Sequence, residues 1–305
     1  MHFQGHGRKR VFGCPAAIAG YNVDGQEDVV DLQSEIDRNV SAALAEDIGP
    51  GDWTAMLTPE GQTARASVVC RGAAVLCGQA WFTGCFRKLD PEVSIIWRAN
   101  DGDSIDRGAC VCELKGDSRA LLTGERTALN FLQTLSAVAT TTRRYVDAVK
   151  GTRASIVDTR KTLPGLRIAQ KYAVRTGGGV NHRLGLYDGV LIKENHVAAA
   201  GGVTRAMAAA RRTAPKGVWI QIEVETLAQL EEALNAGATM VLLDNMTTDQ
   251  MRQAVALTGG RAQLEASGGI TLENVRAIAE TGVDRISIGG LTKDIKAIDL
   301  SMRFD

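Results

Sequence analysis

The chain of 305 residues has no net charge, no long apolar run and no paired cysteine motif. Lys and Arg equal Asp and Glu at 35 each, so no overall positive field indicates a nucleic acid or an anionic membrane as partner. No segment approaches the roughly 18 apolar residues that a membrane helix needs. The six cysteines show no CxxC spacing, which argues against zinc and favours reduced thiols, with disulfides as the alternative. The sequence therefore predicts a cytoplasmic protein that binds neither nucleic acid nor membrane.

The first 33 residues lack the features of a folded or exported segment. A basic stretch is followed by an apolar part, as in a signal peptide, but that part has few bulky residues and is interrupted by glycine and proline. We expect residues 1–33 to be a flexible N-terminal extension. The fold is predicted to begin with a helix capped by Ser34 and Asp37.

Residues 34–123 have the pattern of a small α+β domain. Short β-like pieces punctuated by glycine include ARASVVC, AAVLCG and VSIIW, and GQAWFTGCFRKLD between them has helical spacing. Asp101-Gly102 and Gly108 supply turn residues, so the stretch DGDSIDRGACVCELKG is predicted to form a hairpin.

Residues 124–290 have a different pattern, in which strands alternate with helices. A long helix, GERTALNFLQTLSAVATTTRRYVDAVK, comes first, and six strand-like segments follow: ASIVDT, GVLIKEN, WIQIEVE, TMVLLDN, AQLEASG and DRISIGG. Amphipathic helices between apolar strands indicate parallel β/α structure. Because no GxGxxG motif follows the first strand, we expect an incomplete six-stranded α/β barrel rather than a doubly wound sheet.

Cations gather at the carboxyl ends of the first two of these strands, where α/β-barrel enzymes have their active-site residues. Residues 158–196 contain seven Lys or Arg against three carboxylates. An isolated cation at a strand end is often only a solvated surface charge, and an isolated histidine is often only a buried core residue. Several cations on one rim of the barrel instead indicate an anionic ligand. The residues concerned are Arg160, Lys161, His182, Arg183 and Lys193.

Two acids and two glycine pairs follow the later strands. Glu223 and Asp244 suit sugar hydroxyls, a divalent metal or a developing positive charge, although each could also be an ordinary ion-pair partner. Ser267-Gly268-Gly269 and Ile288-Gly289-Gly290 let backbone N–H groups approach an anion such as phosphate. The strand ends together predict a ligand with several anionic groups and a hydroxylated sugar.

Several long stretches resemble the quinolinate phosphoribosyltransferases (nicotinate-nucleotide pyrophosphorylases). They are ERTALNFLQTLSAVAT, DTRKTLPGLRIAQKYAVRTGGGVNHRLGLYDGVLIKENH, EVE, LLDN and EASGGI, and the resemblance covers residues 36–304. It implies an N-terminal α/β sandwich followed by an incomplete α/β barrel. It also implies the transfer of phosphoribose from phosphoribosyl pyrophosphate to quinolinate with Mg²⁺. The products are nicotinate mononucleotide, pyrophosphate and CO₂, on the route to NAD.

The resemblance assigns roles to the residues of the strand ends. It implies that Lys193, Glu223 and Asp244 are catalytic, with Mg²⁺ held by Glu223 and Asp244, partly through the substrate. The implied ligands of the quinolinate carboxylates are Arg126 (from a partner subunit), Arg160, Lys161, His182 and Arg183. The implied phosphoribosyl site comprises Thr159, Lys193, Ser267, Gly268, Gly269, Ile288, Gly289 and Gly290. The same expectation includes a homodimer with shared active sites, with a higher oligomer as the alternative. Residues 34–123 would cap the barrel and form the dimer contact, and the segment near 291–305 would pack back on them.

Two other functions are compatible with parts of the sequence. An enzyme of the same fold could use a different acceptor, as the homologues associated with molybdenum transport do. A carrier module is the second alternative, because DGDSIDRGACVCELKG resembles the hairpins of biotinyl and lipoyl domains. Lys115 would carry the cofactor, but it stands in ELKGDS rather than in the expected context.

Overall fold

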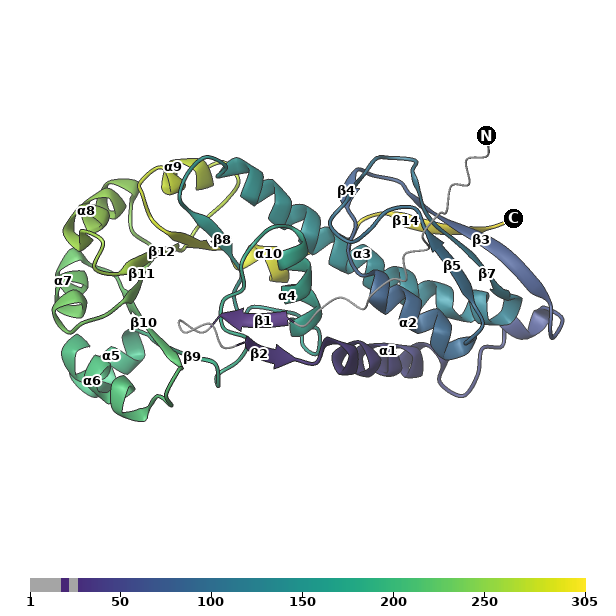
Figure 1. The fold of residues 1–305 in the computed structure, drawn as a ribbon, viewed down its shortest axis with the longest axis horizontal. Helices are drawn as coiled ribbons and strands as arrows, with labels where there is room; N and C mark the ends of the chain where they lie inside the picture. The colour runs from purple at the N-terminus through teal and green to yellow at the C-terminus, as the bar shows by residue number, and fades with distance from the viewer. Residues whose placement is uncertain (1–17, 22–26) are drawn as a thin grey trace, which may run out of the picture.

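The computed structural model describes residues 18–21 and 27–305 and shows two lobes joined by one long helix (Figure 1). The six-stranded parallel sheet lies on the left of the view and the antiparallel sheet on the right. The joining helix, α3 (Ser118–Ala148), is 31 residues long and therefore spans about 46 Å. Asp117 caps it by accepting from the N–H of Ala120. The predicted domain boundary between residues 123 and 124 falls inside this helix.

The right-hand lobe is an antiparallel sheet packed against helices. Its strand order is β14 (Leu300–Phe304), β3 (Thr63–Cys70), β7 (Cys110–Asp117) and β5 (Ser94–Trp97), so the last residues of the chain complete the N-terminal sheet. Helices α1 (Leu32–Ile48), α2 (Gln79–Leu89) and α3 pack on one another beside it. The smaller elements of this lobe are η1 (Ala55–Leu57) and β4 (Ala74–Val75) paired with β6 (Ser104–Ile105). Within the segment predicted to be a flexible extension, β1 (Ile18–Tyr21) pairs with β2 (Glu27–Val30), between the two lobes in Figure 1. Residues 1–17 and 22–26 of that segment lie outside the described residues.

The core of this lobe depends on aromatic residues of α2. Trp81, Phe82 and Phe86 are fully buried, and Phe82 packs edge-on against Phe86 and Trp97. The indole N–H of Trp81 donates to Asn39 of α1 at 3.0 Å, which satisfies the one polar atom of a buried indole. This aromatic cluster fixes α1 and α2 against the sheet.

Two local predictions for this lobe were wrong. The cap of α1 is Asp31, whose carboxylate accepts from the N–H of Gln33, so the helix begins before Ser34 and Leu32 is already part of the core. The hairpin also does not form, because β6 pairs with β4 whereas β7 pairs with β3 and β5. The turn residues are present, with Gly102 and Gly108 at positive φ, but they connect strands of different sheets.

The carrier interpretation is excluded by the position of Lys115. This residue lies within β7, opposite Arg65 of β3 and Ser94 of β5. A modified lysine must project from an exposed turn, whereas Lys115 lies in an interior strand of the sheet.

The left-hand lobe is the incomplete barrel that the sequence predicts. Its parallel strand order is β8 (Ser155–Val157), β13 (Arg285–Ser287), β12 (Gln263–Ser267), β11 (Met240–Asp244), β10 (Trp219–Val224) and β9 (Gly189–Ile192). The helices of this lobe are α4 (Arg167–Thr176), α5 (Glu194–Ala200), α6 (Val203–Thr213), α7 (Leu227–Asn235), α8 (Thr248–Thr258), α9 (Val275–Ala279) and α10 (Gly290–Lys293). No ladder joins β8 to β9, so these are the two free edges of the sheet.

The cationic segment 158–196 runs from one free edge to the other. It leaves β8, forms one parallel bridge from Val180 to Val157, contains α4, and returns as β9. An open barrel needs a cover for these edges, and this segment connects them. Its cations therefore lie where a closed barrel would have further strands.

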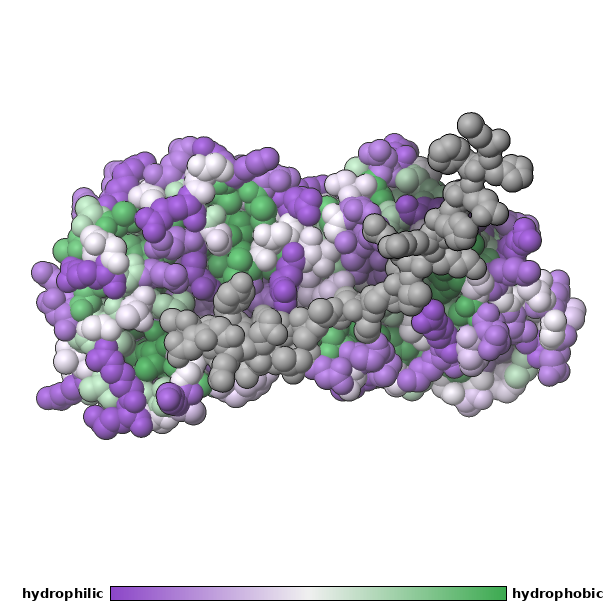
Figure 2. All heavy atoms as spheres, in the orientation of Figure 1, coloured by the Kyte–Doolittle hydropathy of each residue, from purple (hydrophilic) through white to green (hydrophobic). Residues whose placement is uncertain are grey.

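Figure 2 shows hydrophilic residues spread over both lobes of the face in view. None of the described helices is both long and apolar enough to cross a membrane. The described cysteines, Cys70, Cys77, Cys85, Cys110 and Cys112, are free thiols, and Cys14 lies outside the described residues.

Candidate active site

A cavity of about 830 Å³ opens at the carboxyl ends of the barrel strands. Eleven of the predicted site residues line it: Thr159, Lys161, Lys193, Glu223, Asp244, Ser267, Gly268, Gly269, Ile288, Gly289 and Gly290. They come from all six strands of the sheet or from the residues directly after them. Parallel strands bring their carboxyl ends to one edge, which explains why residues more than 100 positions apart meet there.

The acids and one lysine form a charged group in this cavity. The ammonium of Lys193 lies 3.7 Å from the carboxylate of Glu223, whose side chain is only 10% exposed. Burial raises the pKa of Glu223, and the nearby carboxylates of Asp244 and Glu194 raise it further, while Lys193 opposes them. This part of the cavity thus concentrates negative charge beside Lys193, the residue directly after β9.

The glycines allow backbone to form the opposite wall. Gly268 has φ +98°, and a Cβ there would lie 2.0 Å from the side-chain oxygen of Asn245. Asn245 itself has a positive φ of 52°, and its N–H donates to the carbonyl of Ser267 at 3.0 Å. A Cβ on Gly289 would approach Lys161 at 3.1 Å. Gly268 therefore requires glycine, whereas a side chain at Gly289 would press against the flexible Lys161.

The structure adds residues to the cavity that the sequence did not single out. Tyr145 reaches it from α3, and Lys293 reaches it from α10, beyond the last glycine pair. Thr271 and Asp294 also line it. Lys293 could have been found by reading one turn further, whereas Tyr145 gave no signal because it precedes the barrel.

The cationic segment is anchored by a buried ion pair. Lys171 and Asp158 are both fully buried, with the ammonium 2.5 Å from the carboxylate. Asp158 also accepts from the side chain of Asn181 at 2.6 Å and from the N–H of His182 at 2.8 Å. Burial raises the pKa of Asp158 and lowers that of Lys171. One of the seven cations is therefore a structural group that holds residues 181 and 182 against β8.

Two of the predicted carboxylate ligands form a pair of neighbouring guanidinium groups. Burial lowers the pKa of Arg183, and the positive charge of Arg160 lowers it further. Arg183 donates to the carbonyl of Gly189 at 2.9 Å, and the buried Nε of Arg160 has no hydrogen-bond partner. Adjacent like charges with an unsatisfied donor are stabilised when an anion binds between them. Neither residue lines the cavity that holds Glu223 and Asp244.

His182 lies inside the barrel rather than on the cavity wall. Its Nδ1 accepts from the N–H of Arg183 at 2.8 Å, and its Nε2 is 2.9 Å from the side-chain oxygen of Gln221. Trp219 packs edge-on against its ring. Burial lowers its pKa, so the imidazole is neutral at pH 7 in the unliganded structure.

Arg126 is distant from the cavity of its own chain. It lies on α3, as does Tyr145, and nineteen residues of helix place their Cα atoms about 28 Å apart along the axis. Its side chain is exposed on the right-hand lobe. The structure therefore does not bring Arg126 to the other predicted site residues within one chain.

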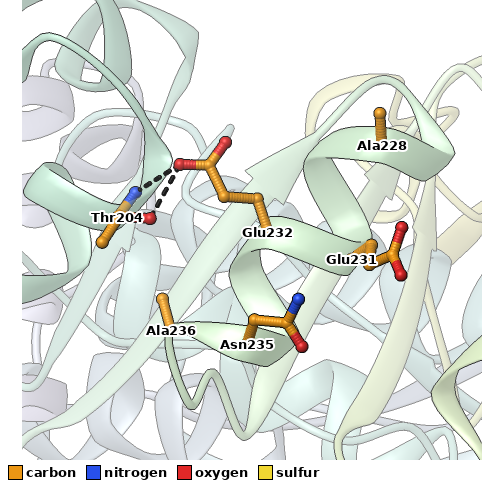
Figure 3. Close-up of a pocket in the computed structure, with 6 residues that line it drawn as sticks. All are labelled: Thr204, Ala228, Glu231, Glu232, Asn235 and Ala236. Carbon is orange, nitrogen blue, oxygen red and sulfur yellow. Dashed lines mark hydrogen bonds between the residues drawn. The ribbon is translucent and has the colours of Figure 1, made fainter.

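A second pocket lies on the outside of the barrel, between α6 and α7. Figure 3 shows the carboxylate of Glu232 on α7 pointing toward Thr204, while Glu231 and Asn235 point elsewhere. Glu232 accepts from the N–H and the hydroxyl of Thr204 at 2.9 and 2.8 Å, which caps the first turn of α6. This pocket joins two helices and gathers no catalytic groups.

The acids of the main cavity fit Mg²⁺ only together with a substrate. Among residues 31–305, no three His, Cys, Asp or Glu side chains come together as a metal site. Glu223 and Asp244 supply two carboxylates, and Mg²⁺ is commonly bound by one or two carboxylates plus substrate phosphates. The donor set is thus suitable for a magnesium–pyrophosphate complex.

Comparisons with known proteins give one consistent result. Residues 52–136 and 138–303 match the N-terminal and C-terminal domains of "Quinolinate phosphoribosyl transferase". A nicotinate-nucleotide pyrophosphorylase (carboxylating) of Mycobacterium leprae is 42% identical over 273 residues, with 86% of this chain and 95% of that protein covered. A quinolinate phosphoribosyltransferase (decarboxylating) of Nicotiana tabacum, called 1b, is 37% identical over 286 residues, with 87% and 81% covered.

A solved structure has the same fold over nearly all of both chains. The nicotinate-nucleotide pyrophosphorylase of Francisella tularensis superposes with a TM-score of 0.85 at 43% identity, covering 90% of this chain and 97% of that one. Both domain matches, the identities and the superposition lead to one conclusion. The chain belongs to the quinolinate phosphoribosyltransferase family.

Proposed function

We propose that the chain transfers phosphoribose from phosphoribosyl pyrophosphate to quinolinate, with loss of CO₂, to give nicotinate mononucleotide for NAD synthesis. The family membership supports the reaction. The observation that carries it is one cavity lined by Glu223 and Asp244, by three lysines and by two glycine loops. A phosphorylated sugar with a pyrophosphate group requires these three kinds of contact.

The phosphoribosyl group is assigned to the cavity. Gly268 and Gly269, with Gly289 and Gly290, would hold the 5′-phosphate through backbone N–H groups, helped by Ser267, Thr159 and Ile288 at the same loops. Lys293 adds a cation at this end. Glu223 and Asp244 would hold the ribose hydroxyls, because carboxylates accept from hydroxyl groups and suit the positive charge that develops on the sugar.

Quinolinate is assigned to the cationic segment. Its two carboxylates would meet Arg160 and Arg183, whose mutual repulsion a dianion relieves. Lys161 and Lys193 line the cavity, so they stand between the acceptor and the sugar. His182 would support this site from inside the barrel, where it contacts the backbone of Arg183.

The reaction then follows from orientation and charge. The ring nitrogen attacks the anomeric carbon, a nitrogen–carbon bond forms, and the bond to the pyrophosphate oxygen breaks. Glu223 and Asp244 stabilise the positive charge on the sugar during this step. Loss of CO₂ leaves an electron pair on the ring carbon beside the cationic nitrogen. That carbon then takes up a proton, which replaces the lost carboxylate.

Mg²⁺ would neutralise the charge of the pyrophosphate as it leaves. Glu223 and Asp244 are the residues that would hold it, partly through the substrate. Lys193 lies 3.7 Å from Glu223, so it would also lie beside the leaving group.

A homodimer with shared sites accounts for the position of Arg126. The residue cannot reach its own cavity along a rigid helix, so a second chain would have to supply it. The exposed apolar residues of this lobe support this: η1 packs on α3, Trp53 and Leu57 are 70% and 84% exposed, and Leu122 is partly exposed one turn before Arg126. Exposed apolar clusters of this kind mark contact surfaces.

The test is an assay on the purified chain. Quinolinate should be consumed, and CO₂ released, only when phosphoribosyl pyrophosphate and Mg²⁺ are both present. Omitting either component should abolish turnover. Consumption of phosphoribosyl pyrophosphate with another pyridine or pyrimidine acid, but not with quinolinate, would instead identify an enzyme of this fold with a different acceptor.

A further inference from the structure

A directional chain of hydrogen bonds crosses the barrel interior beneath the proposed acceptor site. It connects Arg183, His182, Gln221 and Glu265, and Glu265 in turn forms an ion pair with Arg285. Gln221 donates to the carboxylate of Glu265 at 3.1 Å, and the guanidinium of Arg285 lies 3.0 Å from the same carboxylate oxygen. Gln221 and Glu265 are both about 1% exposed. Neither lines the cavity, and the proposed reaction has not so far used either one.

The chemistry of these groups fixes every proton in the chain. A carboxylate can only accept, so Gln221 must turn its NH₂ group toward Glu265 and its carbonyl oxygen toward His182. That oxygen can only accept, so Nε2 of His182 must carry a proton. The backbone N–H of Arg183 can only donate, so Nδ1 of His182 must be without one.

The surrounding charges are consistent with the neutral ring. Glu265 favours a positive His182, but Arg285 and Lys171 oppose it, and Arg285 forms an ion pair with Glu265. Asp158, which accepts from the backbone of His182, is paired with Lys171. Both acids near the ring therefore have another cation beside them, although Oε1 of Glu265 also lies 3.7 Å from Nε2 of His182.

We propose that Gln221 and Glu265 are positioning residues for the acceptor site. They hold His182 as a neutral imidazole with its proton on Nε2, so that Nδ1 fixes the backbone of Arg183. The positive charge that meets the acceptor's carboxylates then comes from Arg160 and Arg183 and not from His182. This inference rests on the proposed placement of quinolinate against those two arginines.

The arrangement has a clear physical benefit. Arg160 and Arg183 already repel each other, and a third positive charge behind them would make the empty site less stable. A neutral ring with fixed hydrogen bonds orients Arg183 without adding charge. The affinity for the dicarboxylate then does not depend on the titration of His182 near neutral pH.

The first measurement needs no variant. Nitrogen-15 NMR of ring-labelled histidine in the full, ligand-free chain reports which ring nitrogen carries a proton, and His182→Asn assigns the signal among the four histidines. His182 should be neutral with its proton on Nε2 at pH 7. A ring protonated on both nitrogens, or on Nδ1 alone, overturns the proposal.

The second measurement uses Glu265→Gln, which keeps the shape but supplies a donor of its own. Gln221 can then rotate its NH₂ group toward His182, and the ring loses the fixed proton arrangement that bonds Arg183. We expect a mixed tautomer and a KM for quinolinate raised about tenfold, as for one lost hydrogen bond, with kcat and the KM for phosphoribosyl pyrophosphate within about twofold. The matched control is Glu280→Gln, an exposed pair with Arg276 on α9, which should change none of these.

Gln221→Met provides a second variant of similar volume if Glu265→Gln does not fold. It removes both bonds of Gln221 and should raise the quinolinate KM in the same direction. If both variants fold and keep the wild-type KM within about twofold, Gln221 and Glu265 do not position the site. A third outcome separates this inference from the proposed function. If His182 has the expected tautomer but Arg183→Ala leaves the quinolinate KM unchanged, quinolinate does not bind at Arg183, although the hydrogen bonds through His182 are correctly assigned.

Discussion

Arg126 and Tyr145 lie on the same helix, and only Tyr145 lines the cavity. The Cα atom of Arg126 lies about 28 Å from that of Tyr145 along the helix axis. A single straight helix cannot bring both to one site. Because α3 also packs on both lobes, it cannot swing to do so. If Arg126 contributes to catalysis, it contributes to the cavity of another chain.

The shared site can be tested by complementation. Arg126→Ala and Lys193→Ala should each be almost inactive alone, because each removes one cation from every site. In a mixed dimer one site has both defects and the other has neither. Random exchange makes about half of the dimers mixed, so about a quarter of the wild-type sites should return. Activity of co-refolded subunits is the measurement, with each variant refolded alone as the control. Confirmed subunit exchange without recovery would show that Arg126 acts within its own chain.

Arg160 should not be replaceable by lysine. Its fork can hold both oxygens of a carboxylate, whereas lysine offers a point charge. Arg160→Ala should raise the quinolinate KM at least about thirtyfold, which corresponds to about 2 kcal/mol, and Arg160→Lys should restore little of it. Steady-state kinetics check this. Arg175→Ala, an exposed cation of the same segment, should behave as wild type. Equal effects of the two alanine variants would remove Arg160 from the acceptor site.

The sequence predicted which strand ends meet at the cavity, because parallel strands follow a simple rule. Each apolar strand was visible, its carboxyl end was polar, and the ends of parallel strands must meet. What could not be predicted depends on packing between distant segments. Nothing in the sequence marks Lys171 as the buried partner of Asp158, or shows that His182 faces the barrel interior while Lys161 faces the cavity. Both depend on how residues 158–196 cross the gap between the free edges.

The beginning of the fold shows how a local signal can mislead. Ser34 and Asp37 have the spacing of a capping box, but Asp31 stands three residues earlier and makes the cap. Its side chain also accepts from the hydroxyl of Ser34, so the serine supports the cap instead of forming it. Two overlapping cap signals were present, and only the burial of Leu32 decides between them.

This cap defines a sharper deletion experiment. Removing residues 1–30 should leave activity and stability nearly unchanged. Removing residues 1–33 should lower the free energy of unfolding by about 3 kcal/mol. The lost cap at Asp31 accounts for about 1 kcal/mol, and the lost burial of Leu32 accounts for about 2 kcal/mol. Chemical denaturation of the two truncated chains gives the difference. Equal stabilities would mean that neither Asp31 nor Leu32 contributes, and a large loss on removing residues 1–30 would mean that they are part of the fold.

Gly268 should be more sensitive to substitution than other glycines with positive φ. Its Cβ would lie 2.0 Å from the side chain of Asn245, and its φ of +98° adds strain. Gly268→Ala should raise the KM for phosphoribosyl pyrophosphate and lower the free energy of unfolding by roughly 1–3 kcal/mol. Gly260→Ala is the control, since it has φ +80° with no atom within 4 Å and lies away from the cavity. If the two variants lose the same stability and keep the same KM, the contact with Asn245 has no role in the site.

His182 should make stability depend on pH in a direction that its burial sets. Burial lowers its pKa in the folded chain below the value of about 6.5 that it has when unfolded. Between these two values the unfolded chain binds more protons than the folded one. The free energy of unfolding therefore falls as the pH falls below about 6.5, by at most about 1.4 kcal/mol per pH unit from this group.

The comparison is made with His182→Asn, which cannot titrate. The variant should be less stable at pH 7.5, because it disturbs the bonds to Arg183 and Gln221. Its stability should nevertheless fall less steeply than that of the wild type between about pH 7 and pH 5.5. Urea denaturation at several pH values measures both curves. Parallel curves would show that His182 has the same proton affinity folded and unfolded, which a ring buried among Trp219, Gln221 and the paired Glu265 should not have.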